Sequence, residues 1–235
     1  MTSLLLLRHA ESEWNARGKW QGWADPPLSS EGVRQARAAG RLLQPVGFTA
    51  VAASDLRRAQ ETAELAAVGL GIPGPVHIDA GLREYDVGEW SGLTRAEIER
   101  RWPGELTAWR QGRLVATPGG ELRDSFVARI AAAVTRVAAV LRHDVVLVIT
   151  HGGVISALER SLGADQRRLA HLGGRWFEAQ FAGDRERRGL RAGEPLFVLE
   201  PDADTEAAGH GRPPEAAEGE GAEFPRTNAD SSTFG

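Results

Sequence analysis

The sequence predicts an α/β fold, a three-layer α/β/α sandwich with a mainly parallel central sheet. Two apolar runs, at residues 4–7 (LLLL) and 145–149 (VVLVI), show no polar alternation. Such runs are typical of strands in a parallel sheet, because helices cover both faces of those strands. Between the strand-like runs, apolar residues recur at helical spacing. Alternating strands and helices of this kind indicate the sandwich.

The first part of the chain alternates between apolar runs and helical patterns. The loop after the first strand is polar and rich in Trp, and Ser29 then caps a helix on which Val33 and Ala36 fall at helical spacing. The expected elements are a strand over 3–8, a loop over 14–27, a helix from 29, a strand over 50–53, a helix over 57–68, a loop over 69–75, a weak strand over 76–78 and an irregular segment over 82–92.

The pattern continues beyond that irregular segment. Thr94 can cap a short helix, which Pro103 ends. A Pro-Gly-Gly break precedes a long helix that places Phe126 and Ile130 on one face. The expected elements are helices over 94–102, 105–111 and 125–142, a strand over 145–149, a helix ending near 162, and strands over 176–181 and 196–199.

Composition divides the chain into two parts. Residues 201–235 contain no Val, Ile, Leu or Met and carry a net charge of −6, whereas residues 1–200 carry +2. A segment without large aliphatic residues buries too little apolar area to offset its ordering entropy. We therefore expect a folded domain over 1–200 and a disordered acidic tail over 201–235.

Several classes of function are excluded or disfavoured by composition. The chain has no cysteine, which excludes disulfides, thiolate nucleophiles and cysteine-bound metals. The weak positive charge of residues 1–200 gives no argument for nucleic acid. No apolar stretch approaches the length that spans a membrane, and four leucines are too few for a signal peptide. We expect a cytoplasmic protein without nucleic-acid or membrane partners.

Two of the predicted strands end in a histidine, at Arg8-His9 and at Thr150-His151. Ligands of open α/β sheets bind at the carboxyl ends of the strands, so adjacent strands would bring both imidazoles to one ligand. Gly152 and Gly153 then begin a helix, whose N-terminal N–H groups favour an anion.

Arg58 follows another strand end, and Glu84 lies in the irregular segment. A simpler interpretation is that Arg8 and His9 cap a strand, that Arg58 lies on a solvated helix face and that Glu84 is ordinary. The joint placement of these residues at strand ends favours a functional site.

The segment Arg8-His9-Ala10-Glu11 resembles the R-H-G-E signature of the histidine phosphatase superfamily, in the branch of cofactor-dependent phosphoglycerate mutases and related phosphatases. Further matching segments lie at 21–23, 27–29, 54–59, 62–63, 82–84, 88–92, 118–121 and 150–153. The resemblance covers roughly residues 3–160. It implies a phosphoglycerate mutase-like fold, with a histidine phosphatase domain over 1–200 and a helical lid over about 94–118.

The resemblance also implies roles for individual residues. His9 would be the nucleophile that becomes phosphohistidine, and Glu84 would protonate the leaving oxygen. The catalytic set would be Arg8, His9, Arg58, Glu84 and His151, and the residues binding phosphate or substrate would be Arg8, Asn15, Gln21, Gly22, Arg58, His151 and Gly152. Two arginines suit phosphate oxygens because their donors form a fixed fork.

The implied function is a metal-independent phosphomonoesterase that needs no cofactor and acts on a small phosphorylated metabolite, such as a sugar phosphate or a phosphoglycerate. The pattern is also similar to phosphatases of glucosyl-phosphoglycerate and of ribazole phosphate. Family members include monomers, dimers and tetramers, so a homodimer is one open state.

Two alternatives stay open. The first is a phosphoglycerate mutase; mutases of this family typically carry a longer, Arg-rich segment before the Gly-Gly-Glu motif, whereas Glu84 and Glu121 are only 37 positions apart here. The second is an inactive binding member of the family. Ala10 raises it, because it replaces a glycine of the signature and would crowd His9 if the backbone needed a positive φ.

Overall fold

A computed structural model describes residues 1–142, 144–166, 169–180 and 189–198 of the chain. The strands are β1 (Thr2–Arg8), β2 (Ala50–Ala53), β3 (His77–Ile78), β4 (Val145–Thr150), β5 (Gly173–Gln180) and β6 (Gly189–Phe197). The α-helices are α1 (Glu13–Ala16), α2 (Ser30–Leu43), α3 (Arg57–Leu70), α4 (Arg95–Arg101), α5 (Glu105–Arg110), α6 (Arg123–Val140) and α7 (Gly152–Ser161). Short 3₁₀ turns occupy Gln44–Val46, Ala80–Leu82 and Gly88–Trp90.

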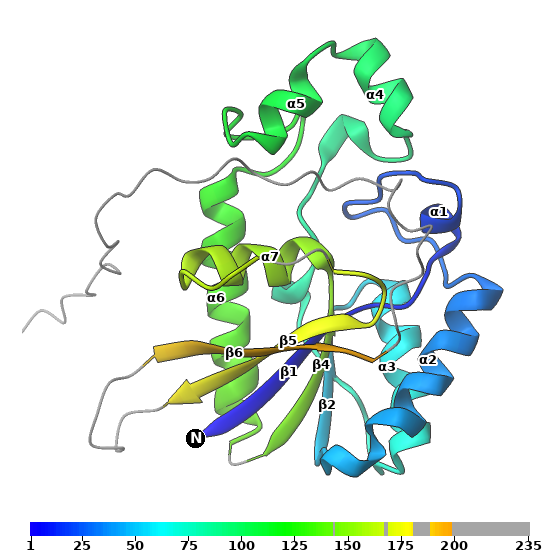
Figure 1. The fold of residues 1–235 in the computed structure, drawn as a ribbon, viewed down its shortest axis with the longest axis vertical. Helices are drawn as coiled ribbons and strands as arrows, with labels where there is room; N and C mark the ends of the chain where they lie inside the picture. The colour runs from blue at the N-terminus through cyan, green and yellow to red at the C-terminus, as the bar shows by residue number, and fades with distance from the viewer. Residues whose placement is uncertain (143, 167–168, 181–188, 199–235) are drawn as a thin grey trace, which may run out of the picture.

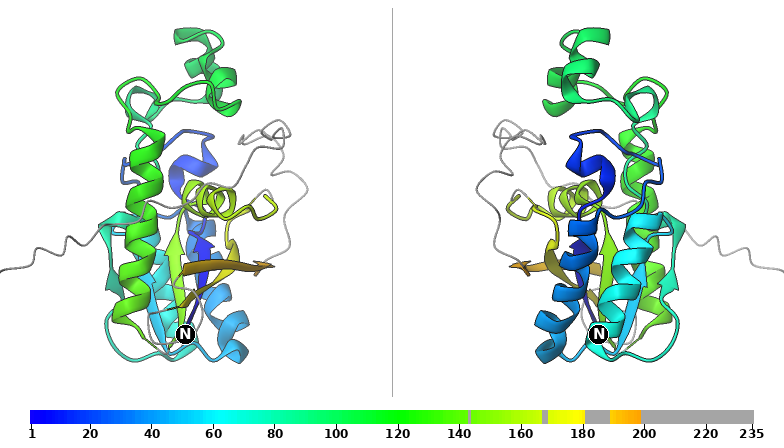
Figure 2. Two further views of the ribbon diagram at one scale, coloured as in Figure 1. Left: turned by 90° about the vertical axis from the view of Figure 1, so that its left-hand side faces the viewer. Right: turned by 90° about the vertical axis from the view of Figure 1, so that its right-hand side faces the viewer.

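The strands form one sheet in the order β3-β2-β4-β1-β5-β6. β1, β2, β3 and β4 are parallel, and β5 and β6 join antiparallel at one side. Helices lie on both faces of this sheet (Figures 1 and 2). The predicted α/β sandwich with a mainly parallel sheet is therefore confirmed.

The leucine run of β1 supplies both halves of the core. Leu4 and Leu6 pack in the cluster that contains residues of α6 and α7, whereas Leu5 and Leu7 pack in the cluster that contains residues of α3. All four side chains are fully buried. Burying a side chain of this size stabilises the fold by about 1.5–3 kcal/mol. This two-sided burial is the physical reason why the run lacks polar alternation.

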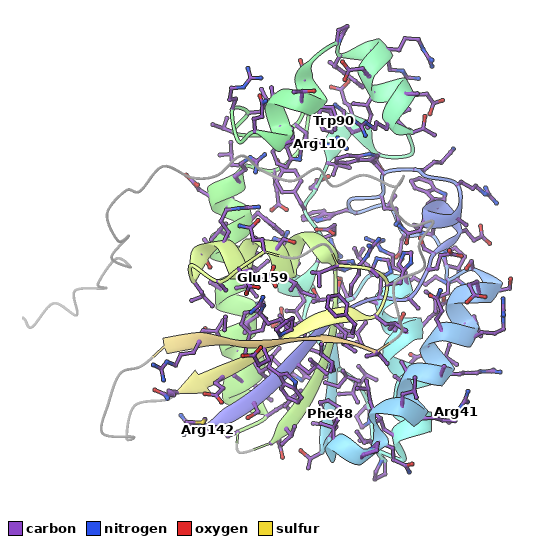
Figure 3. The ribbon with its side chains drawn as sticks, in the orientation of Figure 1. Arg41, Phe48, Trp90, Arg110, Arg142 and Glu159 are labelled. Atoms are coloured by element: carbon purple, nitrogen blue, oxygen red, sulfur yellow. The ribbon has the colours of Figure 1, made fainter. Side chains whose placement is uncertain are left out.

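The two helices of the predicted lid, α4 and α5, stand beyond the carboxyl ends of the parallel strands (Figure 1). Thr94 caps α4 in a reciprocal capping box with Glu97. Trp90 is fully buried at the base of the lid (Figure 3), and its ring meets Trp20 and Trp109 edge to face. These tryptophans therefore pack α5 against the loops beneath it.

The structure corrects several predicted boundaries. A short helix, α1, covers residues 13–16, where the sequence predicted the start of a loop over 14–27. The long helix covers 123–140 rather than 125–142. β5 begins three residues before the expected 176, because Gly173 and Gly174 hide its start. β6 begins at Gly189 rather than at 196 because it is a half-exposed edge strand with a weak apolar pattern. Phe181, Leu199 and the predicted tail over 201–235 lie outside the described residues.

Within the described residues, no helix combines the length and the apolar character that crossing a membrane requires.

Two strand glycines provide a test of the packing. A Cβ on Gly174 would lie 2.0 Å from the Leu6 carbonyl oxygen, whereas a Cβ on Gly189 would meet nothing within 4 Å. We expect Gly174→Ala to destabilise the protein by about 1–3 kcal/mol, because β1 and β5 would have to separate. Gly189→Ala should be near neutral. Thermal unfolding of both variants checks this, and equal melting temperatures would contradict it.

Candidate active site

His9 lies directly after β1, where its N–H donates to the Thr150 carbonyl at the end of β4 (2.9 Å). Its Nδ1 lies 2.7 Å from the Ala10 carbonyl oxygen. A carbonyl can only accept, so Nδ1 carries the proton and Nε2 is left with its lone pair. The Arg58 Nε–H donates to this Nε2 (3.2 Å). The nucleophilic nitrogen expected from the sequence is therefore oriented toward the Arg58 guanidinium.

Arg58, in the first turn of α3, is a buried cation without a carboxylate partner among the described residues. Its side chain donates to the carbonyls of Gly22 (2.9 Å) and Ala24 (2.8 Å) and to His9, all neutral groups. Only 1% of the residue is exposed, and burial lowers its pKa to about 10, so it stays charged at neutral pH. A buried charge is costly unless it is paired, so this position favours an anionic ligand.

His151 occupies the N-cap position of α7 without a side-chain hydrogen bond to the helix, and its ring centroid lies 5.2 Å from that of His9. The residue is fully buried, and neither ring nitrogen has a hydrogen-bond partner among the described groups. Burial, together with the positive charges of Arg58 and Arg8, lowers the pKa of His151 well below its usual value. The same causes, burial first, lower the pKa of His9. The protein thus holds two neutral imidazoles beside two cations.

Glu84 approaches the site at the N-terminus of α7. Its Oε2 accepts from the Gly153 N–H (3.1 Å) and its Oε1 from the Tyr85 N–H (2.8 Å). A Cβ on Gly153 would lie 2.1 Å from Oε1, so only glycine leaves room for the carboxylate there. Glu84 also acts electrostatically on Arg58, which places the carboxyl group on the side of the cluster of basic residues.

The structure adds His171, which sequence analysis missed. Arg8 donates to the Leu169 carbonyl (2.8 Å) and, through Nη2, to His171 Nε2 (3.2 Å). The next residue, Leu172, has φ 58°, the one left-handed non-glycine conformation among the described residues. Such a conformation costs of the order of 1–3 kcal/mol and persists only where the surroundings enforce it. Apart from the Gly-Gly pair two residues later, no local signal marks His171, because the contact spans 163 positions.

The remaining predicted residues lie around this cluster. Asn15 Oδ1 and Gln21 Oε1 both lie within 3 Å of the Ser12 hydroxyl, so these two amides brace the loop that leads to Gly22. Gly22 has a positive φ and presents its carbonyl to Arg58. Gly152 is the first residue of α7, and a Cβ there would lie 3.5 Å from Arg8. Contact of these residues with substrate stays a prediction.

Ala10 fits its position without strain. Its φ is not positive, and it is completely buried, with its N–H donating to Thr62 Oγ1 (3.2 Å). The crowding that the sequence suggested for this position is therefore absent.

Among the described residues, no group of three or more His, Cys, Asp or Glu side chains is placed to hold a metal ion. Metal independence remains a prediction for the assay described below.

A neutral, oriented imidazole beside two arginines and a second imidazole is an arrangement that can bind the oxygens of a phosphoryl group and present a nitrogen nucleophile to phosphorus. Residues 4–175 match the family model of the histidine phosphatase superfamily (branch 1). The chain belongs to this superfamily.

The related proteins are named either as phosphoglycerate mutases or as phosphatases. The 2,3-bisphosphoglycerate-dependent phosphoglycerate mutase of Methylobacterium sp. (strain 4-46) is 40% identical over 161 residues, which cover 66% of this chain and 77% of that protein. A mycobacterial glucosyl-3-phosphoglycerate phosphatase, solved with VO3, is 30% identical with a TM-score of 0.70, over 81% of this chain and 96% of that one. A putative alpha-ribazole-5'-P phosphatase from Escherichia coli is 27% identical with a TM-score of 0.66. The match covers 77% of this chain and 92% of that one.

The buried imidazoles predict a dependence of stability on pH. The pKa values of His9, His151 and His171 all lie below the ordinary 6.5, that of His171 at about 3 because of burial and Arg8. Between those values and 6.5 the unfolded chain binds protons that the folded chain does not, so stability must fall as pH drops below 6.5. For His171, whose pKa in the folded protein is about 3, the cost at pH 5 is about 2 kcal/mol.

Thermal unfolding at pH 7.5 and pH 5 checks this prediction, and His171→Gln should reduce the difference between the two melting temperatures. A melting temperature that is unchanged or higher at pH 5 would contradict it.

Proposed function

We propose that this protein is a phosphomonoesterase that hydrolyses a small phosphorylated metabolite through a phosphohistidine intermediate. The observation that carries the proposal is the buried Arg58 guanidinium, which has only neutral partners and lies against the attacking nitrogen of His9. The unpartnered ring of His151 supports it further, because a phosphoryl oxygen could accept a hydrogen bond from its one N–H.

The proposed reaction has two steps. His9 Nε2 attacks phosphorus while the bond to the leaving oxygen breaks, and Glu84 gives that oxygen a proton. Water then attacks the phosphohistidine, Glu84 takes the proton of the water, and inorganic phosphate leaves as His9 is regenerated. Arg8 and Arg58 neutralise charge on the phosphoryl oxygens in both steps, which is the main demand of phosphoryl transfer.

The group attached to the leaving oxygen would lie on the Glu84 side of the site. Trp23 is partly exposed there, and its Nε1–H donates to the Glu84 carbonyl (2.8 Å). The Arg83 guanidinium lies 4.9 Å from the Trp23 ring centroid and pairs with Asp55. An indole and a guanidinium together suit a sugar or carboxylate-bearing leaving group, which agrees with a sugar phosphate or phosphoglycerate-type substrate.

A phosphoglycerate mutase is the second candidate, and the names of the curated relatives favour it. The solved phosphatases named above match this chain over almost their whole length, which favours hydrolysis. The two reactions share the first step and differ in whether water or a second substrate hydroxyl accepts the phosphoryl group.

The decisive assay measures phosphate release from p-nitrophenyl phosphate in the presence of a chelator. We expect activity in the wild type and at least a 10²-fold loss in His9→Ala, because no other nucleophile replaces the imidazole. Conversion of 3-phosphoglycerate to 2-phosphoglycerate is followed in parallel. Isomerisation much faster than phosphate release would support the mutase, and activity that disappears in chelator would refute metal independence.

Gly153→Ala tests the placement of the proton donor. The new methyl group would displace the Glu84 carboxylate, and a misplacement of about 1 Å can cost about 10²-fold in rate. We expect a fall in kcat on this scale with little change in melting temperature. Gly152→Ala is the matched variant, because its Cβ meets Arg8 only at van der Waals distance, and its loss should be much smaller. Equal losses in the two variants would contradict the prediction.

A further inference from the structure

The backbone around Glu84 is held by one side chain from α6. Residues 81–86 form no strand or α-helix, so their carbonyls lack regular backbone partners. Arg129 donates to three of these carbonyls, those of Gly81 (2.9 Å), Arg83 (2.9 Å) and Glu84 (3.1 Å). Its guanidinium is thus the common anchor of the segment that carries the proposed acid.

Glu121 fixes the other edge of the same guanidinium. Arg129 Nη2 donates to Glu121 Oε1 (2.6 Å), and Nε donates to Oε2 (3.3 Å). Glu121 Oε1 also accepts from the Asp86 N–H (2.9 Å). The ion pair is largely buried, with 21% of the Arg129 side chain and 15% of the Glu121 side chain exposed. Both partners therefore bind backbone groups of the segment that carries Glu84.

We propose that Arg129 is a positioning residue that sets the backbone of Glu84 so that its carboxyl group reaches the leaving oxygen. This inference rests on the proposed function. The Glu84 carboxylate is bound at its tip by the Gly153 N–H, and the Arg129 contacts define the backbone from which it extends. Proton transfer in the transition state requires hydrogen-bond reach, so a shift of this backbone would weaken it.

The hydrogen bonds of Arg129 explain why its action is indirect. Arginine has five N–H donors, and the five contacts described above use all of them. None remains to bind a phosphoryl oxygen. Lysine has only three donors and no fork, so it cannot reproduce this set.

Arg136 provides a matched control on the same helix. It lies two turns after Arg129 and pairs with Asp79 (2.8 Å), so its replacement also removes an ion pair from this face of α6. Among the described residues, its hydrogen bonds go to the Asp79 carboxylate and none goes to the backbone of 81–86.

The test compares two substrates of similar shape, p-nitrophenyl phosphate and phenyl phosphate. The nitrophenolate leaves readily without a proton, whereas phenolate depends more on the acid. We expect Arg129→Met to lower kcat/KM, which reports only the steps up to departure of the leaving group, about tenfold or more for phenyl phosphate and less than threefold for p-nitrophenyl phosphate, since general acid catalysis contributes about 10²–10⁴-fold. Glu84→Gln should show the same pattern more strongly, Arg129→Lys an intermediate loss, and Arg136→Met neither loss.

Equal losses on both substrates, or no loss, would overturn the proposal and indicate a purely structural role. If Arg129→Met does not fold, Arg129→Lys and Glu121→Gln carry the comparison, with folding checked by circular dichroism. A wild type that hydrolyses neither substrate would instead refute the proposed function itself, and the inference with it.

Discussion

The site depends on a positive charge that the fold buries without a carboxylate partner. Arg58 is held by two carbonyls and by the His9 imidazole, so its hydrogen-bond partners among the described residues are all neutral. Desolvation of this charge is costly, and the fold sustains it because other contacts over-determine the position. Burial, together with the positive charges of Arg58 and Arg8, keeps His9 and His151 neutral, and the proposed attack by His9 requires a neutral imidazole.

The parallel pairing of β1 with β4 supplies the geometry. In this register Arg8 pairs with Thr150, so the residues that follow both strands emerge side by side. The leucine run of β1 is buried on both faces, which makes this pair the rigid centre of the sheet. The ends of β1 and β4 cannot shift without disrupting the core. Reactions that need in-line positioning benefit from residues attached to such a rigid support.

The Glu84 side of the site is built differently. Glu84 belongs to an irregular segment, and side chains from elsewhere replace the missing regular hydrogen bonds. Arg129 and Trp23 both donate to the Glu84 carbonyl, and the N-terminus of α7 binds its carboxylate. Tyr85 also links this segment to Glu121 and packs on Trp109 of the lid. The proposed proton donor therefore lies where the segment that carries α4 and α5 joins the rest of the structure.

The sequence by itself determined the sandwich, the central strands and the histidines at their ends. These follow from local periodicity and from where an apolar run stops, and both signals lie within a few consecutive residues. Tertiary structure decided that His171 contacts Arg8, that Gly153 admits the Glu84 carboxylate and that Arg129 anchors the segment behind it. The physical reason is separation along the chain: these contacts join residues 163, 69 and 45 positions apart, so no local pattern encodes them.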